Sequence, residues 1–200
     1  MPEILIQDID IALTMDDQRS QLSAVDLRIR DGIIAEIGSG LTTEGERISG
    51  KGCVVTPGLV NTHHHLYQNL TRAVPGAQDA LLFGWLKRLY PIWSAFTPDD
   101  IHVSAQLGLA ELAFSGCTLT SDHLYLYPNG SRLEDTIEAA GDIGLRFQPT
   151  RGAMSIGESA GGLPPGRLVG GGRAILGGLV RVVDRFHGPA GGSMGRVALA

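Results

Sequence analysis

Cysteine is scarce in this sequence, and the long apolar runs of membrane proteins are missing. The 200 residues include 2 cysteines, Cys53 and Cys117, too few and too far apart for the disulfide frameworks of small secreted domains. No apolar run approaches the roughly 20 residues that a membrane-spanning helix needs. The first residues also lack the basic and apolar segments of a secretory signal. We therefore expect a cytoplasmic protein with no membrane partner.

Positive charge is also in short supply. The chain carries 16 Lys and Arg against 21 Asp and Glu, a net charge of -5, and the basic residues form no stripe or cluster. A nucleic-acid partner would require such a basic surface. The expected partners are instead a small-molecule substrate and water.

Several catalytic motifs are missing as well. The sequence contains no G-x-S-x-G, no phosphate-binding P-loop and no G-x-G-x-x-G, so serine hydrolysis and nucleotide-phosphate binding have no signal. It also lacks the H-x-E and P-C-x-x-C pair of cytidine-type zinc deaminases.

Glycine, in contrast, is abundant. The chain has 28 glycines, many of them in the stretch 161–195. Because a glycine inside a helix or strand costs roughly 0.5–1 kcal/mol relative to alanine, we expect this stretch to be looser than the rest, and several of its glycines have no evident structural need. Residues 155–173 are rich in glycine and proline, which predicts a lid or a disordered loop.

Residues 4–55 have the pattern of strands and turns. Isoleucines recur through residues 4–11 with one irregularity, and Val25, Leu27 and Ile29 alternate with polar residues. The dipeptide Asp31-Gly32 is a strong hairpin signal. We therefore assign residues 1–55 to the N-terminal part of a small β-sandwich.

Residues 56–200 alternate between strand and helix patterns. Helices are predicted over 81–90, from Pro98 after the capping residue Thr97, over 133–143 and over 175–186, with Pro91 closing the first. Strands are predicted over 117–123 and 145–150 and from residue 197. This rhythm is typical of a parallel α/β fold, with three complete βα units and the start of a fourth.

Three histidines follow a short apolar segment, Leu59-Val60. Because strand side chains alternate between faces, His63 and His65 should point one way and His64 the other. Two imidazoles side by side form a pair of ligands for zinc, iron or nickel. The alternative interpretation is a solvated loop that binds metal only adventitiously.

The residues around these histidines resemble a known family. Pro57-Gly58-Leu59-Val60-Asn61-Thr62-His63-x-His65 is similar to the first-strand motif of the amidohydrolase superfamily, whose members hold one or two metals at the mouth of a (β/α)8 barrel. Further segments resemble the aminopurine deaminase branch and most of all the 8-oxoguanine deaminases: Leu70-Thr71-Arg72-Ala73-Val74-Pro75, Phe83-Gly84-Trp85-Leu86, Ser115-Gly116-Cys117-Thr118, Ser121-Asp122-His123-Leu124-Tyr125 and Arg151-Gly152-Ala153-Met154-Ser155.

The resemblance implies an α/β fold, namely an incomplete (β/α)8 TIM-like barrel over 56–200 preceded by the sandwich segment. A complete barrel needs roughly 250 residues, so the chain corresponds to the N-terminal part of the family's fold. In the family, the sandwich is completed by strands from the far C-terminus.

The resemblance also implies the metal ligands. His63 and His65 would hold one divalent metal, with zinc the first choice and iron the second. The family's other ligands, a histidine after the fifth barrel strand and an aspartate after the eighth, and its acidic proton shuttle correspond to positions beyond this chain. No catalytic residue is therefore assigned within it.

Four further residues are candidates for substrate binding. By resemblance, Gln68 reads the purine edge, and Arg151 grips a purine carbonyl or anionic ring through its planar guanidinium. Trp85 is a candidate for stacking on the ring, and His123, with Asp122 beside it at the end of the second strand, for contact with the substrate or with the metal ligands. Ordinary alternatives remain open: a turn cap for Gln68, a core position for Trp85 and a loop hydrogen bond for His123.

The resulting hypothesis is hydrolytic deamination of an aminopurine such as 8-oxoguanine or guanine, by a complete protein for which a homo-oligomer is one option. We expect the 200 residues alone to be inactive. One alternative is a truncated, non-catalytic remnant with weak metal binding. Another is a chlorotriazine-type hydrolase of the same branch.

Overall fold

A computed structural model describes residues 3–200 of the chain, which form two compact units. The first unit ends at Gly58 and the second spans Leu59–Ala200.

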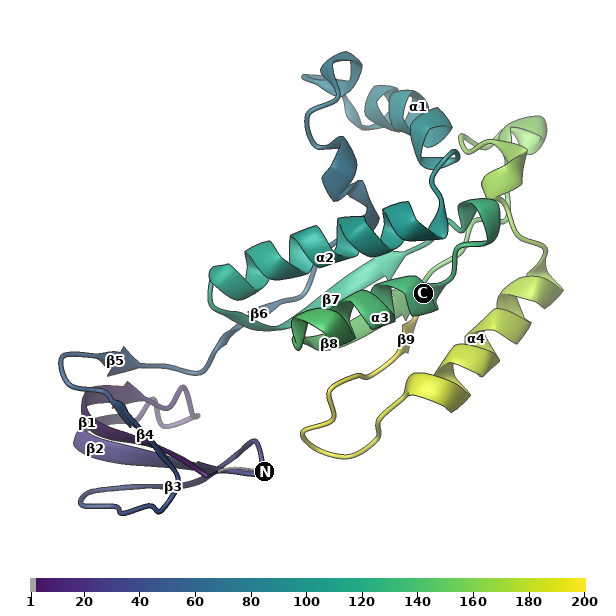
Figure 1. The fold of residues 1–200 in the computed structure, drawn as a ribbon. Coiled ribbons are helices and arrows are strands. Elements are labelled where there is room, and N and C mark those ends of the chain that lie inside the picture. The colour runs from purple at the N-terminus through teal and green to yellow at the C-terminus, as the bar shows by residue number, and fades with distance from the viewer. Residues whose placement is uncertain (1–2) are drawn as a thin grey trace. The chain divides into compact units, whose positions relative to one another are not determined.

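The first unit is a single five-stranded sheet. It consists of β1 (Ile4–Leu13), β2 (Gln21–Arg30), β3 (Ile33–Gly38), β4 (Glu46–Ser49) and β5 (Val54–Val55). The order is β3-β2-β1-β4, and β5 also pairs with β1 (Figure 1). Strands β1, β2 and β3 are antiparallel, whereas β4 and β5 run parallel to β1. Residues 3–58 therefore form a single sheet, and the second layer of the expected sandwich stays a prediction.

The predicted turn and irregularity both occur in this sheet. Asp31 and Gly32 have φ values of 52° and 76° and join Arg30 to its partner Ile33, the positive-φ geometry that a two-residue hairpin requires. The register of β1 against β2 shifts between Ile6 and Ile9. Both predictions are confirmed.

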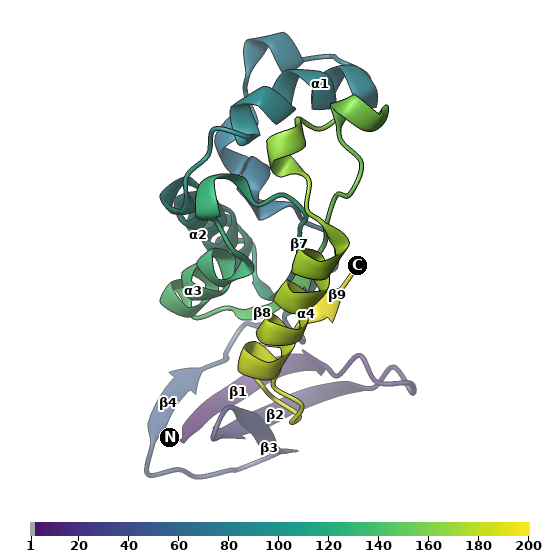
Figure 2. The same cartoon turned by 90° about the vertical axis from the view of Figure 1, so that its right-hand side faces the viewer.

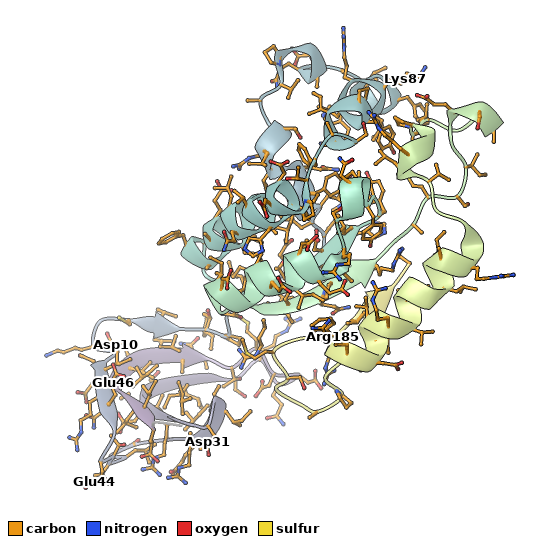
Figure 3. The ribbon with its side chains drawn as sticks, turned by 45° about the vertical axis from the view of Figure 1, so that its right-hand side comes forward. Asp10, Asp31, Glu44, Glu46, Lys87 and Arg185 are labelled. Carbon is orange, nitrogen blue, oxygen red and sulfur yellow. The ribbon has the colours of Figure 1, made fainter. Side chains whose placement is uncertain are left out.

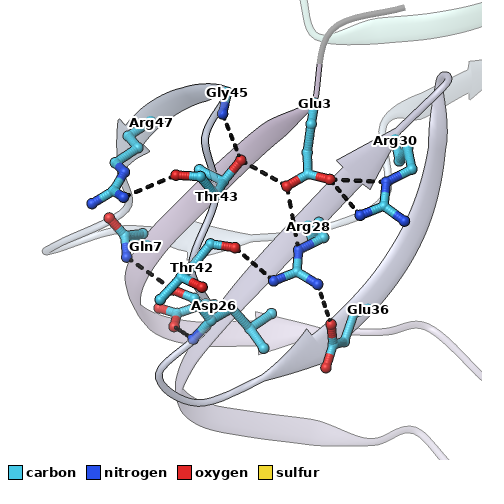
Figure 4. A network of polar contacts seen from close by, with 11 residues as sticks. Glu3, Gln7, Asp26, Arg28, Arg30, Glu36, Thr42, Thr43, Gly45 and Arg47 are labelled. Atoms are coloured by element: carbon cyan, nitrogen blue, oxygen red, sulfur yellow. Dashed lines mark hydrogen bonds and ion pairs between the residues drawn. The ribbon is translucent and has the colours of Figure 1, made fainter.

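Glu3 organises a polar network at one side of this sheet (Figure 4). Its carboxylate accepts hydrogen bonds from Oγ1 of Thr43 at 2.7 Å and from Nε of Arg30 at 2.8 Å, and these bonds hold the pKa of Glu3 below its usual value. Gly45 lies so close that a Cβ there would be 2.1 Å from the carbonyl oxygen of Glu3. The network therefore ties the start of β1 to the loop before β4.

The second unit is a half-barrel of parallel strands. Its sheet follows the order β6 (Leu59–Asn61), β7 (Cys117–Leu124), β8 (Arg146–Arg151) and β9 (Ala198–Leu199), and each pair is parallel. The helices are α1 (Leu82–Trp93), α2 (Pro98–Phe114), α3 (Leu133–Ile143) and α4 (Gly172–Phe186), with short 3-10 helices at Leu66–Thr71, Pro75–Ala77, Pro128–Gly130, Glu158–Ala160 and Gly166–Leu168.

Helices α2 and α3 run side by side next to β7 and β8 (Figures 1 and 2). Helix α4 is tied to α3 by an ion pair between Arg181 and Glu134, with 3.2 Å between Nε and Oε1.

The six charged side chains labelled in Figure 3 are all exposed. Among residues 3–200, no helix combines the length and the apolar character needed to cross a membrane.

Capping residues set one end of each of two helices, and the sequence predicts the first of them. Thr97 precedes α2 and accepts from the backbone N–H of Asp100, whose carboxylate accepts in return from the N–H of Thr97. This reciprocal capping box satisfies two backbone donors that a helix start leaves free. Helix α3 ends at Gly144 with φ 79°, the left-handed conformation that favours glycine.

The prediction that Pro91 closes the first helix was wrong, because α1 continues to Trp93. A proline here lacks the N–H that would bond to the carbonyl of Lys87 and crowds that carbonyl, so the last turn needs other support. Trp93 is fully buried, with its ring centroid 5.1 Å from that of Tyr67 and 5.6 Å from that of Tyr90. This packing holds the final turn in the helical conformation.

Structural needs explain only some of the late glycines. Gly161 has φ 83°, and a Cβ at Gly162 would lie 2.2 Å from the carbonyl oxygen of Ile156. At Gly177, inside α4, a Cβ would meet nothing within 4 Å. The first two positions therefore require glycine, whereas the third does not.

Candidate functional site

The three histidines leave the carboxyl end of β6. The strand ends at Asn61, whose Nδ2 donates to Oγ1 of Thr120 on β7 at 3.0 Å, and whose Oδ1 accepts from the backbone N–H of His63 at 3.4 Å. Catalytic residues of parallel barrels gather at this end of the strands. The histidine segment therefore begins from an anchored strand end.

Three imidazoles meet beyond this strand end. The ring centroids of His63 and His65 are 5.2 Å apart, and those of His65 and His123 are 5.5 Å apart. The ring of His64 lies apart from this group: its Nδ1 is buried without a hydrogen-bond partner among the described residues. Burial lowers the pKa of both His64 and His123, which favours neutral rings.

One hydrogen bond defines the proton position on His65. Its Nδ1 lies 2.8 Å from the backbone carbonyl oxygen of His123, and a carbonyl oxygen can only accept, so Nδ1 carries the proton. The lone pair of Nε2 is then free for a metal, the arrangement typical of metal-binding histidines. The donor set of His63 and His65 therefore fits a divalent transition metal.

The described residues do not complete a metal site by themselves. Across residues 3–200, no group of three or more His, Cys, Asp or Glu side chains is arranged to hold a metal ion. A catalytic zinc usually has three protein ligands. His63 and His65 alone therefore do not make up a complete zinc site.

Asp122 lies on β7, next to His123 in sequence. Its side chain is 1% exposed, and its Oδ1 accepts from the backbone N–H of Leu66 at 2.7 Å. Burial raises the pKa of Asp122 to about 7, since desolvation disfavours the charged carboxylate. The residue directly after His65 is thus bound to a buried carboxyl group.

An aromatic cluster borders the histidines. The ring of Tyr125 packs edge-on against His65 at 5.4 Å between centroids, and against Tyr67 at 5.6 Å. Burial raises the pKa of Tyr67 and Tyr125, and raises that of Tyr90 to about 12. The three hydroxyl groups therefore remain protonated and able to donate at neutral pH.

The predicted substrate residues lie at different places around this cluster. Nε2 of Gln68 donates to the hydroxyl of Tyr67 at 3.0 Å, which leaves the amide oxygen of Gln68 free of that bond. His123 is in ring contact with His65, as described above. These two residues therefore lie close to the metal-ligand pair.

Arg151 and Trp85 each pack against another aromatic ring. The guanidinium of Arg151 stacks over the ring of Tyr127, 4.3 Å from its centroid, and borders a cavity of about 120 Å³ that Tyr125 and Arg167 also line. Trp85 is half-buried in α1, with its ring centroid 5.2 Å from that of Trp93. Trp85 thus packs at the margin of the hydrophobic core.

Sequence reasoning missed Tyr125 and Gly152 as parts of this site. A Cβ at Gly152 would lie 2.2 Å from Nε2 of His123 and 2.8 Å from Cβ of Tyr125, so a glycine is needed for the His123 ring to lie where it does. The available signal for Tyr125 was its position two residues after His123, which places it on the same side of the chain.

Comparison with known proteins identifies the family. The model of the amidohydrolase family matches residues 54–172, more than half of the chain. The chain belongs to the amidohydrolase family. It is 47% identical to an 8-oxoguanine deaminase of Pseudomonas aeruginosa, over 74% of this chain and 33% of that protein. It is also 33% identical to a hydroxydechloroatrazine ethylaminohydrolase of Pseudomonas sp. strain ADP, over 94% of this chain and 42% of that protein.

The fold matches solved amidohydrolases. The structure of atrazine chlorohydrolase from Arthrobacter aurescens, complexed with zinc, superposes with a TM-score of 0.89 at 31% identity, covering 98% of this chain and 46% of that one. The chain spans less than half the length of each of these three relatives. The mixed α/β half-barrel described above is thus an amidohydrolase segment.

Proposed function

We propose that this chain contributes the first metal ligands and the base-reading residues of an amidohydrolase that deaminates an aminopurine such as 8-oxoguanine or guanine. The observation that carries the proposal is the pairing of His63 with His65, 5.2 Å apart between ring centroids, beside Gln68. The 47% identity to an 8-oxoguanine deaminase supports the choice of substrate class.

In this proposal each residue of the site has a separate role. His63 and His65 hold one divalent metal, with zinc favoured because a zinc-bound relative shares the fold. A divalent metal supplies Lewis-acid activation of a water molecule for attack on the amino-bearing carbon. Gln68 offers its amide oxygen to a purine edge, since its Nε2 already bonds to Tyr67.

Arg151 and His123 complete the proposed substrate contacts. The guanidinium of Arg151 lies over the ring of Tyr127, so its freedom is restricted before a purine carbonyl arrives, and less freedom is lost on binding. His123 presents a ring beside His65. Trp85 is the weakest of the four candidates, because its ring packs on Trp93.

A chimera tests this function. The chain would replace the matching segment of the Pseudomonas aeruginosa 8-oxoguanine deaminase, and ammonia release from 8-oxoguanine and guanine would be measured with zinc or iron. We expect turnover by the chimera, loss of turnover in the His63→Ala and His65→Ala chimeras, and none from the 200 residues alone. A folded chimera that binds metal but deaminates neither purine would contradict the proposal.

A second candidate is hydrolysis of a substituted triazine. Its support is the likeness to atrazine chlorohydrolase and to hydroxydechloroatrazine ethylaminohydrolase, which covers almost the whole chain. Chloride or alkylamine release from triazines, measured with a chimera built on the triazine relative, distinguishes the two. Triazine hydrolysis by this chimera, together with no purine deamination by the first chimera, would favour the triazine function.

A further inference from the structure

Asp122 occupies a position where a carboxyl group is costly. It lies in the middle of the sheet on β7, 1% exposed, and its Oδ2 is buried with no hydrogen-bond partner in the part of the chain that the structure describes. Burying a carboxyl group is unfavourable unless its oxygens find donors. The bond that Asp122 makes to the backbone N–H of Leu66 should therefore have a use beyond filling the core.

That bond is one of three that tie the histidine segment to the end of β7. The carbonyl oxygen of His64 accepts from the backbone N–H of His123 at 2.9 Å. Nδ1 of His65 bonds to the carbonyl oxygen of His123 at 2.8 Å, and the N–H of Leu66 donates to Oδ1 of Asp122 at 2.7 Å. Three consecutive residues are thus bound by two consecutive residues of the neighbouring strand.

Only one of these three bonds depends on the identity of a residue on β7. His123 contributes backbone atoms, which any residue would offer, whereas Asp122 contributes its side chain. Without Oδ1 the N–H of Leu66 would lose its partner, and the peptide between His65 and Leu66 would be held only through its carbonyl, which accepts from the N–H of Gln68. The ring direction of His65 depends on both backbone neighbours.

From this geometry we infer that Asp122 is a positioning residue for His63 and His65: its carboxyl group helps to fix the backbone at Leu66 and so keeps Nε2 of His65 available beside the His63 ring, where the two imidazoles would bind a metal. The inference rests on the proposed function, since it takes His63 and His65 as the ligands. Groups that orient a metal ligand typically change metal affinity by about 10–100-fold when removed.

The test compares zinc affinity and stability in three variants of the full chain. Asp122→Ala removes the acceptor, and Asp122→Asn keeps one acceptor oxygen with nearly the same shape. Thr136→Val is the matched control, because Thr136 is equally buried but its Oγ1 bonds to the carbonyl oxygen of Leu133 inside α3. We expect zinc affinity to fall about 10–100-fold for Asp122→Ala, less for Asp122→Asn, and not at all for Thr136→Val.

A metal-free readout accompanies these titrations. The 15N chemical shifts of the His65 ring report its tautomer and its bond to His123. We expect them to change in both Asp122 variants and to stay constant in Thr136→Val. Unchanged ring shifts and unchanged zinc affinity in Asp122→Asn would overturn the inference, and so would an equal loss of affinity in Thr136→Val. If Asp122→Ala does not fold, the zinc affinity and the His65 ring shifts of Asp122→Asn decide whether the inference holds.

Failure of the underlying function would look different. If the wild-type chain binds no zinc, or binds it equally well after His63→Ala, the proposed metal pair is wrong. The His65 ring shifts in the Asp122 variants would still show whether Asp122 orients that ring.

Discussion

Nδ1 of His65 lies 2.8 Å from the backbone carbonyl oxygen of His123, and this contact joins two segments that are 58 residues apart in sequence. Since the carbonyl oxygen fixes the proton on Nδ1, Nε2 of His65 is the nitrogen available to a metal. We therefore expect His63→Ala and His65→Ala each to weaken zinc binding by more than about tenfold, because a chelating pair becomes a single imidazole.

Zinc titration of the purified chain measures this effect. His187→Ala is the control, because His187 follows α4 and bonds to the carbonyl oxygen of Val197 at 3.3 Å. An equal loss of affinity in the control would show that zinc binds to histidines without regard to position.

Gly152→Ala should disturb the site without touching a proposed ligand. The added Cβ would lie 2.2 Å from Nε2 of His123, so the ring must move or the strand end must shift. Such overpacking typically costs about 1–3 kcal/mol of unfolding free energy. Urea unfolding measures the loss, and the ring signals of His123 in NMR spectra report its displacement. Wild-type stability with unmoved signals would contradict the packing described here.

Gly177→Ala should have the opposite effect. Nothing lies within 4 Å of a Cβ at this position, and alanine is favoured over glycine inside a helix by roughly 0.5–1 kcal/mol. We expect the free energy of unfolding to rise by about that amount in urea titrations. A decrease would mean that Gly177 has a role that the packing of α4 does not show.

Trp85→Ala separates a core role from a substrate role. The Trp85 ring packs edge-on against Trp93 at 5.2 Å between centroids, and its removal should lower the free energy of unfolding by about 2–3 kcal/mol, somewhat less than a fully buried tryptophan. Trp85→Phe should restore most of this. The neighbouring Phe83 is 66% exposed, so Phe83→Ala is the control. If Trp85→Ala costs no more than Phe83→Ala, stacking on a substrate becomes the better explanation.

Asp26 predicts an acid-dependent loss of stability in the first unit. Its carboxylate accepts from the backbone N–H groups of Asp8 and Leu41, both at 2.9 Å, and these bonds hold its pKa below the ordinary value of 3.8. The unfolded chain therefore binds the proton more readily than the folded one. The resulting stability is present above the ordinary pKa and is lost as the pH falls through the folded pKa.

The comparison of wild type with Asp26→Asn checks this. We expect the variant to melt at a lower temperature at neutral pH, and the difference to stay constant down to about pH 5 and to shrink below about pH 4. Asp17→Asn, at an exposed position, should melt like the wild type. A difference that grows on acidification would contradict the assigned direction of the pKa.

Local signals in the sequence were enough to place most of the elements. The helix expected over 133–143 is α3, Leu133–Ile143, and the capping pair of Thr97 with Pro98 set the start of α2. These features depend on residues within one or two helical turns. Pro91 was misread because the packing of Trp93, which holds the last turn, comes from residues distant in sequence.

The site was less predictable for the same reason. Strand alternation led us to expect His63 and His65 on one face, but β6 ends at Asn61 and the histidines follow it, so alternation is not what brings their rings to 5.2 Å. The bond from Leu66 to Asp122 and the contact of Gly152 with His123 link segments that only the parallel sheet brings side by side. Their spacing in the sequence carries no periodic signal, so no local pattern could reveal them.

The order of the parallel strands, β6-β7-β8-β9, is also their order of synthesis. Each strand pairs with the one made just before it, so a growing chain always has a partner strand in place when the next one leaves the ribosome. Each pairing spans a whole βα unit, as between Leu59 and Cys117, so the intervening chain must be made and ordered before the strands can meet, which makes such pairing slow. The half-barrel can therefore assemble stepwise during translation, one βα unit at a time, with the histidine segment placed only once β7 has emerged and paired.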